Sequence, residues 1–164
     1  MTHPSMPTET IVLGGGCFWC TEAVFDRVRG VVDVESGYSN GQVMHPSYEQ
    51  VCTGRTGHAE VVKVAFDPAQ ISLREILEIF FVVHDPTTLN RQGNDVGTQY
   101  RSAIFYHDDS QREAAVRAIQ RAQPKWPRPI VTEVVPFTNF YEAEDYHQDY
   151  LQRKPNGYTC HYLR

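Results

Sequence analysis

The hydrophobic and polar positions of this chain follow two different periods, and the periods predict where its strands and helices lie. Short runs rich in β-branched residues between turn residues are typical of strands, whereas apolar residues three and four positions apart are typical of helices. We expect strands at 8–14, 31–38, 59–66, 102–106 and 129–135. We expect helices over 17–28, 72–83 and 110–123, and a helical turn within 142–151.

The order of these elements predicts the fold class. The first six alternate as strand, helix, strand, strand, helix, strand, which is the ferredoxin-like split βαβ pattern. We therefore expect an α+β two-layer sandwich with helices over a mixed sheet. Long loops at 39–57 and 85–100 and an irregular C-terminal tail at 137–164 interrupt it. Because compact domains rarely keep such loops without a use, we expect them to carry the site, with the tail packed nearby.

Composition narrows the class of protein. With 164 residues the chain has the length of one domain, spanning 1–164, in which 1–7 are expected to be disordered. Its net charge of −5 argues against nucleic-acid binding. No apolar run reaches the roughly 20 residues of a membrane span, and the N-terminus has no secretion signal. We expect a cytoplasmic protein.

The four cysteines, Cys17, Cys20, Cys52 and Cys160, favour thiol chemistry or a metal site, because disulfides are uncommon in a reducing cytoplasm. Cys17 follows a strand and three glycines and begins a helix. The helix-start amides favour a thiolate and lower the cysteine pKa, so this is a good position for a nucleophile. The structural alternative is a buried, inert cysteine.

Cys20 lies three residues after Cys17, on the same side of the predicted helix and within disulfide reach. This spacing leaves two alternatives open. The pair can serve a general thiol–disulfide oxidoreductase, or it can belong to a metal-binding or redox-sensing module. Zinc is disfavoured because there is no second C-x-x-C and the other cysteines are isolated. We predict no metal.

Five segments resemble one enzyme family. They are GGCFWC at 15–20, SGYSNG at 36–41, and the blocks at 45–68, 84–106 and 142–158. Together they are similar to the A-type peptide methionine sulfoxide reductases. The resemblance implies reduction of methionine-S-sulfoxide, in proteins and as the free amino acid, through a cysteine sulfenic acid and then a disulfide. It also implies recycling by thioredoxin, with no metal or organic cofactor.

The chemistry and the resemblance together assign the two central roles. Cys17 is the expected nucleophile. Protonating the departing oxygen requires a carboxylic acid whose pKa is raised by an apolar surround. Glu60 opens an apolar strand and matches the family's acid. Without the resemblance, a solvated edge residue would be the better interpretation of Glu60.

The resemblance also implies the residues that bind substrate. Tyr48 and Tyr100 match oxygen-binding positions, since a phenol O–H can donate to a sulfoxide oxygen. Phe18 and Trp19 would contact the S-methyl group. Asp95 matches a position that orders its loop or binds the substrate backbone.

One departure from the family concerns the second thiol. The family motif usually ends in glycine where this chain has Cys20, and Cys160 resembles the resolving cysteine of many tails. Both are candidates, and proximity favours Cys20 as the first to react. We interpret Cys52 as a small buried hydrophobe. His58 and His147 are expected to have structural or supporting roles.

Overall fold

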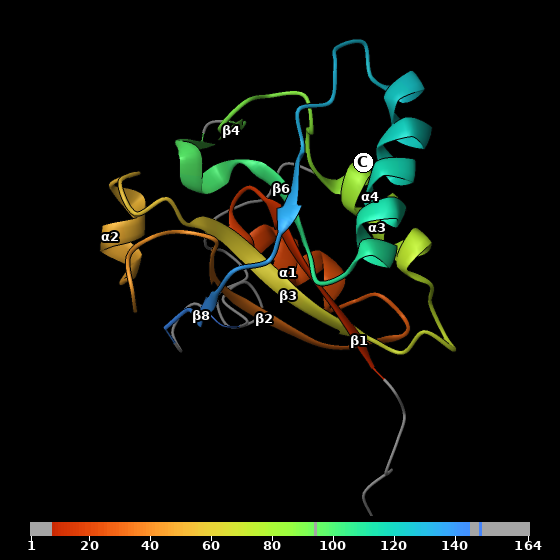
Figure 1. The fold of residues 1–164 in the computed structure, drawn as a ribbon, viewed down its shortest axis with the longest axis horizontal. Helices are drawn as coiled ribbons and strands as arrows, with labels where there is room; N and C mark the ends of the chain where they lie inside the picture. The colour runs from red at the N-terminus through yellow and green to blue at the C-terminus, as the bar shows by residue number, and fades with distance from the viewer. Residues whose placement is uncertain (1–7, 94, 145–147, 149–164) are drawn as a thin grey trace, which may run out of the picture.

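In the computed structural model, which describes residues 8–93, 95–144 and 148, one curled sheet of six strands forms the centre of the fold (Figure 1). The strand order is β7-β6-β1-β3-β2-β8. The strands are β1 (Glu9–Gly15), β2 (Val31–Ser39), β3 (Ala59–Phe66), β6 (Ser102–Tyr106), β7 (Glu133–Pro136) and β8 (Phe140–Glu142). A separate two-stranded sheet pairs β4 (Arg91–Gln92) with β5 (Asp95–Val96).

The four central strands confirm the predicted topology. β1 and β2 are joined through α1 (Phe18–Phe25), and β3 and β6 through α3 (Leu73–Val83). Each connection passes over one intervening strand, which is the split βαβ arrangement. The sheet is mixed because β6 and β7 pair in parallel, whereas its other neighbours are antiparallel.

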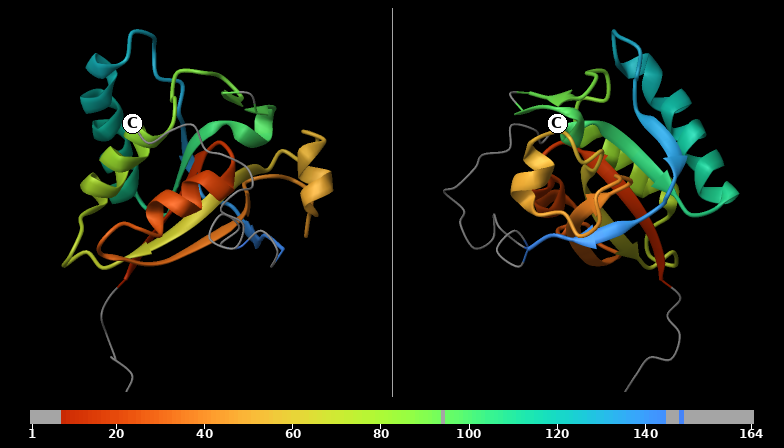
Figure 2. Two further views of the ribbon diagram at one scale, coloured as in Figure 1. Left: turned by 180° about the vertical axis from the view of Figure 1, so that it is seen from behind. Right: turned by 60° about the vertical axis from the view of Figure 1, so that its left-hand side comes forward.

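The helices lie on one face of the sheet. Figure 2 shows α1 in front of the strands, with α3 and α4 (Asp109–Ala122) beside it. Because side chains alternate along a strand, Leu13 points into the core under the helices, whereas Val12 belongs to a smaller cluster on the opposite face. Phe137, which follows β7, and Phe140, the first residue of β8, pack against that smaller cluster. Both faces of β1 are therefore covered.

The two predicted loops contain local structure that the hydrophobic pattern did not indicate. The 39–57 segment contains α2 (Tyr48–Cys52), which begins at a capping box formed by Ser47 and Gln50. The 85–100 segment contains β4, β5 and the 3-10 helix η1 (Thr98–Tyr100). A helix as short as α2 shows no apolar stripe, and its capping box leaves no periodic signal. The hydrophobic pattern alone therefore predicts a loop at this position.

Other boundaries differ from prediction. The first helix begins at Phe18 with Cys17 as its N-cap, and it ends at Phe25. The predicted strand at 129–135 is shorter and shifted, following the 3-10 helix η2 (Gln123–Lys125). The start of the predicted tail is a strand, β8, paired with β2. The predicted helical turn at 142–151 falls largely outside the described residues, as do 1–7 and Cys160. No helix of the described part is long and apolar enough to cross a membrane.

Candidate active site

Cys17 sits at the junction of β1 and α1, directly after Gly16. Gly16 has a φ of +94°, a conformation that disfavours any residue with a Cβ. The Cys17 carbonyl accepts the Cys20 and Thr21 amides at 3.1 and 3.3 Å, which starts the helix. Its thiol interacts with the Trp19 and Cys20 amides, which lower its pKa. The strand–glycine–helix placement predicted from the sequence is confirmed.

The net direction of the Cys17 pKa differs from the prediction. Burial of the thiol is the largest effect, and the nearby Glu60 carboxylate adds to it, so the pKa lies well above that of an ordinary cysteine. The two helix-start amides act in the predicted direction but are outweighed. Sequence spacing identifies those amides, whereas burial depends on the tertiary structure.

Glu60 lies beside the nucleophile in the interior. It is the second residue of β3, and only 1% of its surface is exposed. The Phe18 N–H donates to Glu60 Oε1 at 3.2 Å. Burial raises the Glu60 pKa to about 8, with a smaller contribution from Asp95, while the Phe18 amide lowers it. Glu60 Oε2 has no hydrogen-bond partner among the described residues. The carboxyl is thus held by one oxygen and is protonated at neutral pH.

The two predicted oxygen-binding tyrosines converge on the same place. Tyr48 is the first residue of α2, and Tyr100 is the last residue of η1. Burial and the Glu60 charge raise both phenol pKa values, and the charges of nearby cysteine thiols raise them further. Both phenols therefore remain protonated at any physiological pH and can act as donors, and that of Tyr48 is hydrogen-bonded with Cys52 in this structure.

Asp95, at the start of β5, lies near this group. Its charge raises the pKa values of Cys17, Glu60 and Tyr100. The fold thus brings five of the predicted residues together from β1–α1, β3, α2, η1 and β5. Whether Asp95 orders its loop or binds the substrate backbone stays a prediction.

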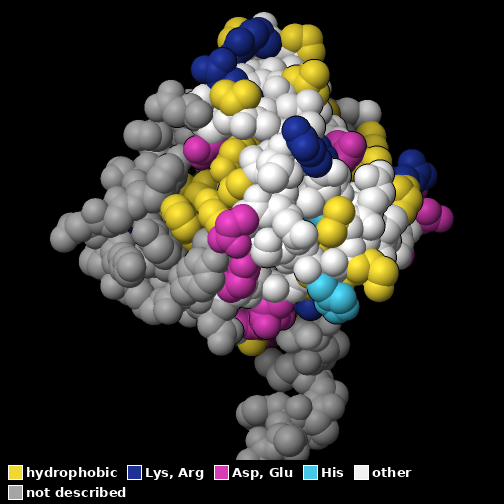
Figure 3. Space-filling model, turned by 90° about the vertical axis from the view of Figure 1, so that its left-hand side faces the viewer, with side chains coloured by type: hydrophobic (Ala, Val, Ile, Leu, Met, Phe, Trp, Pro, Cys, Tyr) yellow, Lys and Arg dark blue, Asp and Glu magenta, His cyan; other side chains and the backbone are white. Residues whose placement is uncertain are grey.

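Aromatic rings form one wall beside the nucleophile. The Tyr48 ring stacks on those of Phe18 and Trp19, each with centroids 6.4 Å apart. Phe18 is buried, whereas Trp19 and Tyr48 are partly exposed. Figure 3 looks onto the side of the molecule that carries α2, where apolar side chains gather. Of the two predicted apolar contacts, Trp19 is therefore the one that offers surface to a ligand.

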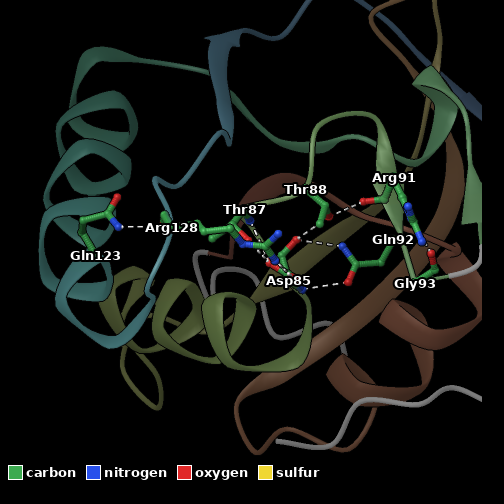
Figure 4. A network of polar contacts seen from close by, with 8 residues as sticks. All are labelled: Asp85, Thr87, Thr88, Arg91, Gln92, Gly93, Gln123 and Arg128. Atoms are coloured by element: carbon green, nitrogen blue, oxygen red, sulfur yellow. Dashed lines mark hydrogen bonds and ion pairs between the residues drawn. The ribbon is translucent and has the colours of Figure 1, made fainter.

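The loop that follows α3, here called the bracing loop, contains a network of polar contacts (Figure 4). The Asp85 N–H donates to Gln92 Oε1 at 2.7 Å, and Gln92 Nε2 donates to the Asp85 carbonyl at 2.9 Å. Arg128 pairs with the Asp85 carboxylate at 3.6 Å. A Cβ on Gly16 would lie 2.6 Å from Gln92 Cγ, so this side chain packs directly against the residue before Cys17. Sequence reasoning missed Gln92, because nothing in its spacing separates it from other loop glutamines.

The remaining cysteines and histidines differ in their bonding and in their burial. Cys20 is disulfide-bonded, whereas Cys17 and Cys52 are free thiols. The prediction that Cys52 is buried is wrong. It ends the short surface helix α2, where its exposed side chain hydrogen-bonds with Tyr48.

His58 is buried and structural: its Nδ1 accepts the Gly41 N–H at 3.0 Å, and its Nε2 bonds the Val43 carbonyl at 2.7 Å. Cys160 and His147 lie outside the described residues.

No three His, Cys, Asp or Glu side chains within the described part of the chain come together in a way that could hold a metal ion.

Comparison with known proteins identifies the family. Residues 9–164 match the family model described as peptide methionine sulfoxide reductase. The chain is 59% identical over 152 residues to the peptide methionine sulfoxide reductase MsrA of Sulfolobus acidocaldarius, covering 93% of this chain and 86% of that relative. The chain belongs to the peptide methionine sulfoxide reductase family.

Solved structures agree with this assignment to the reductase family. The reduced form of Mxr1 from Saccharomyces cerevisiae is 44% identical, with a TM-score of 0.92 over 96% of this chain and 92% of that one. Mxr1 in complex with Trx2 is 30% identical, with a TM-score of 0.65 over 92% of this chain and 89% of that one. The resemblance and the α+β fold class are both confirmed.

Proposed function

We propose that this chain reduces methionine-S-sulfoxide, in oxidised proteins and as the free amino acid, with Cys17 as nucleophile and Glu60 as general acid. The observation that carries these roles is the Glu60 carboxyl beside the buried thiol. Its pKa of about 8 keeps it protonated at neutral pH, and its Oε2 has no partner among the described residues. Such a carboxyl can give its proton to a sulfoxide oxygen.

The chemical step is a two-electron transfer between two sulfur atoms. The Cys17 sulfur attacks the sulfoxide sulfur while Glu60 protonates the sulfoxide oxygen. The sulfur–sulfur bond made by this attack and the sulfur–oxygen bond of the substrate then break as the oxygen bonds to Cys17, giving methionine and a Cys17 sulfenic acid. The substrate sulfur is reduced, the Cys17 sulfur is oxidised, and the thiol proton returns Glu60 to its acid form.

The state of Glu60 also helps Cys17 to ionise. The Glu60 negative charge is the second cause of the raised thiol pKa. While Glu60 is protonated that contribution is absent, and the Trp19 and Cys20 amides still favour the thiolate. The thiol therefore loses its proton more readily while Glu60 still holds its own.

The remaining residues bind and orient the sulfoxide. The protonated phenols of Tyr48 and Tyr100 donate to its oxygen and stabilise charge that develops there. The Trp19 ring, backed by Phe18 and Tyr48, receives the S-methyl group. Asp95 orders its loop or holds the substrate backbone.

Regeneration needs a second thiol and an external dithiol. A thiol condenses with the Cys17 sulfenic acid and releases water, and thioredoxin then reduces the resulting disulfide by exchange. We propose Cys20 as the first partner, because it is three residues away on the same helix, and Cys160 as the group that carries the disulfide outward. The Mxr1–Trx2 complex supports thioredoxin as the reductant. We also propose a reducing, cytoplasmic location and a single catalytic domain over 1–164.

The test is a turnover assay with dithiothreitol that compares the two epimers of methionine sulfoxide. We expect consumption of the S epimer with stoichiometric oxidation of dithiol, and no consumption of the R epimer. The alternative, a general thiol–disulfide oxidoreductase that uses Cys17 and Cys20, predicts no loss of either epimer. Equal consumption of both epimers would contradict the proposed stereochemistry.

A further inference from the structure

The Glu144 side chain joins two elements of the site that are far apart in the sequence. Its Oε1 accepts the Tyr38 hydroxyl at 2.8 Å, and its Oε2 accepts the Tyr48 N–H at 3.0 Å. The two bonds span 106 and 96 residues of chain. One carboxylate therefore connects the end of β2 and the start of α2 to the segment after β8.

Both partners of Glu144 belong to the aromatic wall beside the nucleophile. Tyr38 is fully buried, and its ring lies 5.7 Å from that of Phe18. Phe18 in turn donates its N–H to Glu60. Tyr48 stacks on Phe18 and Trp19, and the Glu60 charge raises the pKa of its phenol. The Glu144 carboxylate thus bonds the Tyr38 hydroxyl and the Tyr48 backbone N–H, and Phe18 packs against the rings of both residues.

The bond to Tyr48 satisfies an amide that α2 leaves without a helical partner. The Ser47 side chain caps the Gln50 amide, and the first-turn amides of a helix have no acceptor within it. Since α2 is only five residues long, little else in the helix fixes the direction of Tyr48. A charged acceptor at this amide is stronger than a neutral one.

Glu144 is itself held in place by the sheet. The preceding residue, Ala143, donates its N–H to the Ser36 carbonyl at 2.9 Å. The Gln148 side chain bonds both the N–H and the carbonyl of Ser36, at 3.0 and 2.9 Å, and the Ala143 carbonyl at 3.0 Å. The backbone that carries Glu144 is therefore fixed to β2, and its carboxylate can transmit that position to α2.

We propose that Glu144 is a positioning residue for the sulfoxide step, which directs the Tyr48 phenol toward Cys17 and Glu60. This role rests on the proposed function, because it requires the Tyr48 hydroxyl to act on the substrate oxygen. Glu144 does not touch the substrate. It acts through Tyr48, and it makes the correct geometry of the site depend on the segment that follows β8.

The test is a double-mutant cycle between Glu144 and the Tyr48 hydroxyl, measured by single-turnover reduction of methionine-S-sulfoxide. Glu144→Ala is expected to slow the step about tenfold, the rate equivalent of about one lost hydrogen bond, with a smaller change in KM. Tyr48→Phe keeps the ring and removes only the hydroxyl. In that background Glu144→Ala is expected to cause little further loss, because the group it positions is gone.

Three further variants sharpen the cycle. Glu144→Gln is expected to restore most of the rate, since its oxygen can accept the Tyr48 N–H while its amide donates to the Tyr38 oxygen. Glu142→Ala, two residues earlier on the exposed side of β8, is the matched control and should leave the rate unchanged. If Glu144→Ala does not fold, Glu144→Asp, which withdraws the carboxylate by one methylene, takes its place in the cycle.

A tenfold loss from Glu144→Ala that persists in the Tyr48→Phe background would overturn the proposal, as would a wild-type rate for Glu144→Ala. An impaired Glu144→Ala alongside an unimpaired Tyr48→Phe would also overturn it, since the phenol would then not be the route. None of these results affects the roles of Cys17 and Glu60, which are tested separately by substitution of those residues.

Discussion

The Glu60 carboxyl lies close to the Cys17 thiol, and its charge raises the pKa of that thiol. Burial disfavours charge on both, so neutral acid and neutral thiol are the resting forms at pH 7. The resemblance, with the need for a proton donor, predicted a raised Glu60 pKa, whereas the residues alone favoured a solvated edge glutamate. Sequence reasoning predicted the wrong direction for Cys17, because the helix-start amides can be read from the sequence whereas the depth of burial cannot.

Replacing the acid tests its role directly. Glu60→Gln keeps the size of the side chain and an acceptor for the Phe18 N–H but has no proton to give. We expect the sulfoxide step to slow by ~10²-fold or more, the usual scale for a general acid, with the fold retained. Single-turnover rates at pH 7 provide the measurement, and Glu113→Gln on the exposed face of α4 serves as the control. An unchanged rate would remove Glu60 from the mechanism.

The pH dependence follows from the same carboxyl. Glu60 is the proton donor only in its acid form, and its pKa is about 8. Both wild type and Glu60→Gln need the Cys17 thiol to lose its proton, so the ratio of their rates isolates the acid. This ratio should be high below that pKa and should fall as pH rises through it. Single-turnover rates of both proteins, followed from pH 6 to pH 10, give this profile, and a ratio that does not change with pH would contradict the assignment.

At the scale of elements, the turn between β1 and α1 requires glycine for two separate reasons. Gly16 adopts a φ of +94°, and a Cβ there would lie 2.6 Å from Gln92 Cγ. The sequence predicted the first requirement from the run of glycines. It could not predict the second, because the bracing loop approaches from 76 positions further along the chain.

Gly16→Ala should therefore be more harmful than backbone strain alone explains. Alanine at a positive φ costs about 1–2 kcal/mol, and the contact with Gln92 adds to it. Gly54, with a φ of +74° and no neighbour closer than 3.8 Å, is the control for strain without the contact. In urea unfolding we expect Gly16→Ala to lose more stability than Gly54→Ala, and only Gly16→Ala to slow turnover. Equal losses with full activity in both would show that the bracing loop is unimportant.

Predictability differs among the elements for physical reasons. The four central strands and the helices α3 and α4 have an apolar period, and the sequence predicts them to within a few residues. The shorter α1 has almost no such period, and the predicted helix runs past its end at Phe25. α2, β4, β5 and η1 are stabilised by side chain–backbone bonds such as Ser47 with Gln50, which leave no periodic pattern. The tail strand β8 depends on pairing with β2, a partner about 100 residues away. The resemblance identified Tyr48, Tyr100 and Asp95, whereas their convergence depends on these unpredicted elements.

At the scale of the whole molecule, the proposed regeneration route connects α1 to the far end of the chain. Cys20 is disulfide-bonded while Cys17 is free, so the two thiols of the C-x-x-C motif are not joined to each other here. We predict that a Cys17–Cys20 bond forms first and that Cys160 then attacks Cys20. One equivalent of methionine sulfoxide, a quench within seconds and disulfide mapping by mass spectrometry give the order.

A Cys17–Cys160 bond that appears first, with Cys20 still open to alkylation, would contradict that order. Full thioredoxin-coupled turnover by Cys20→Ser would also contradict that order. Cys52→Ser is the control for a thiol near the site, since Cys52 contacts Tyr48 but has no proposed part in the exchange.

Transfer of one oxygen equivalent from the S epimer to Cys17 is measured most directly where no second thiol can resolve it. Reduced Cys20→Ser/Cys52→Ser/Cys160→Ser protein, in which Cys17 is the one cysteine left, would receive one equivalent of each epimer separately, with dimedone to trap sulfenic acid. We predict one methionine formed per trapped Cys17 with the S epimer, none with the R epimer, and none after Cys17→Ser. Methionine formed without adduct on Cys17, or formed by the Cys17→Ser variant, would contradict the mechanism.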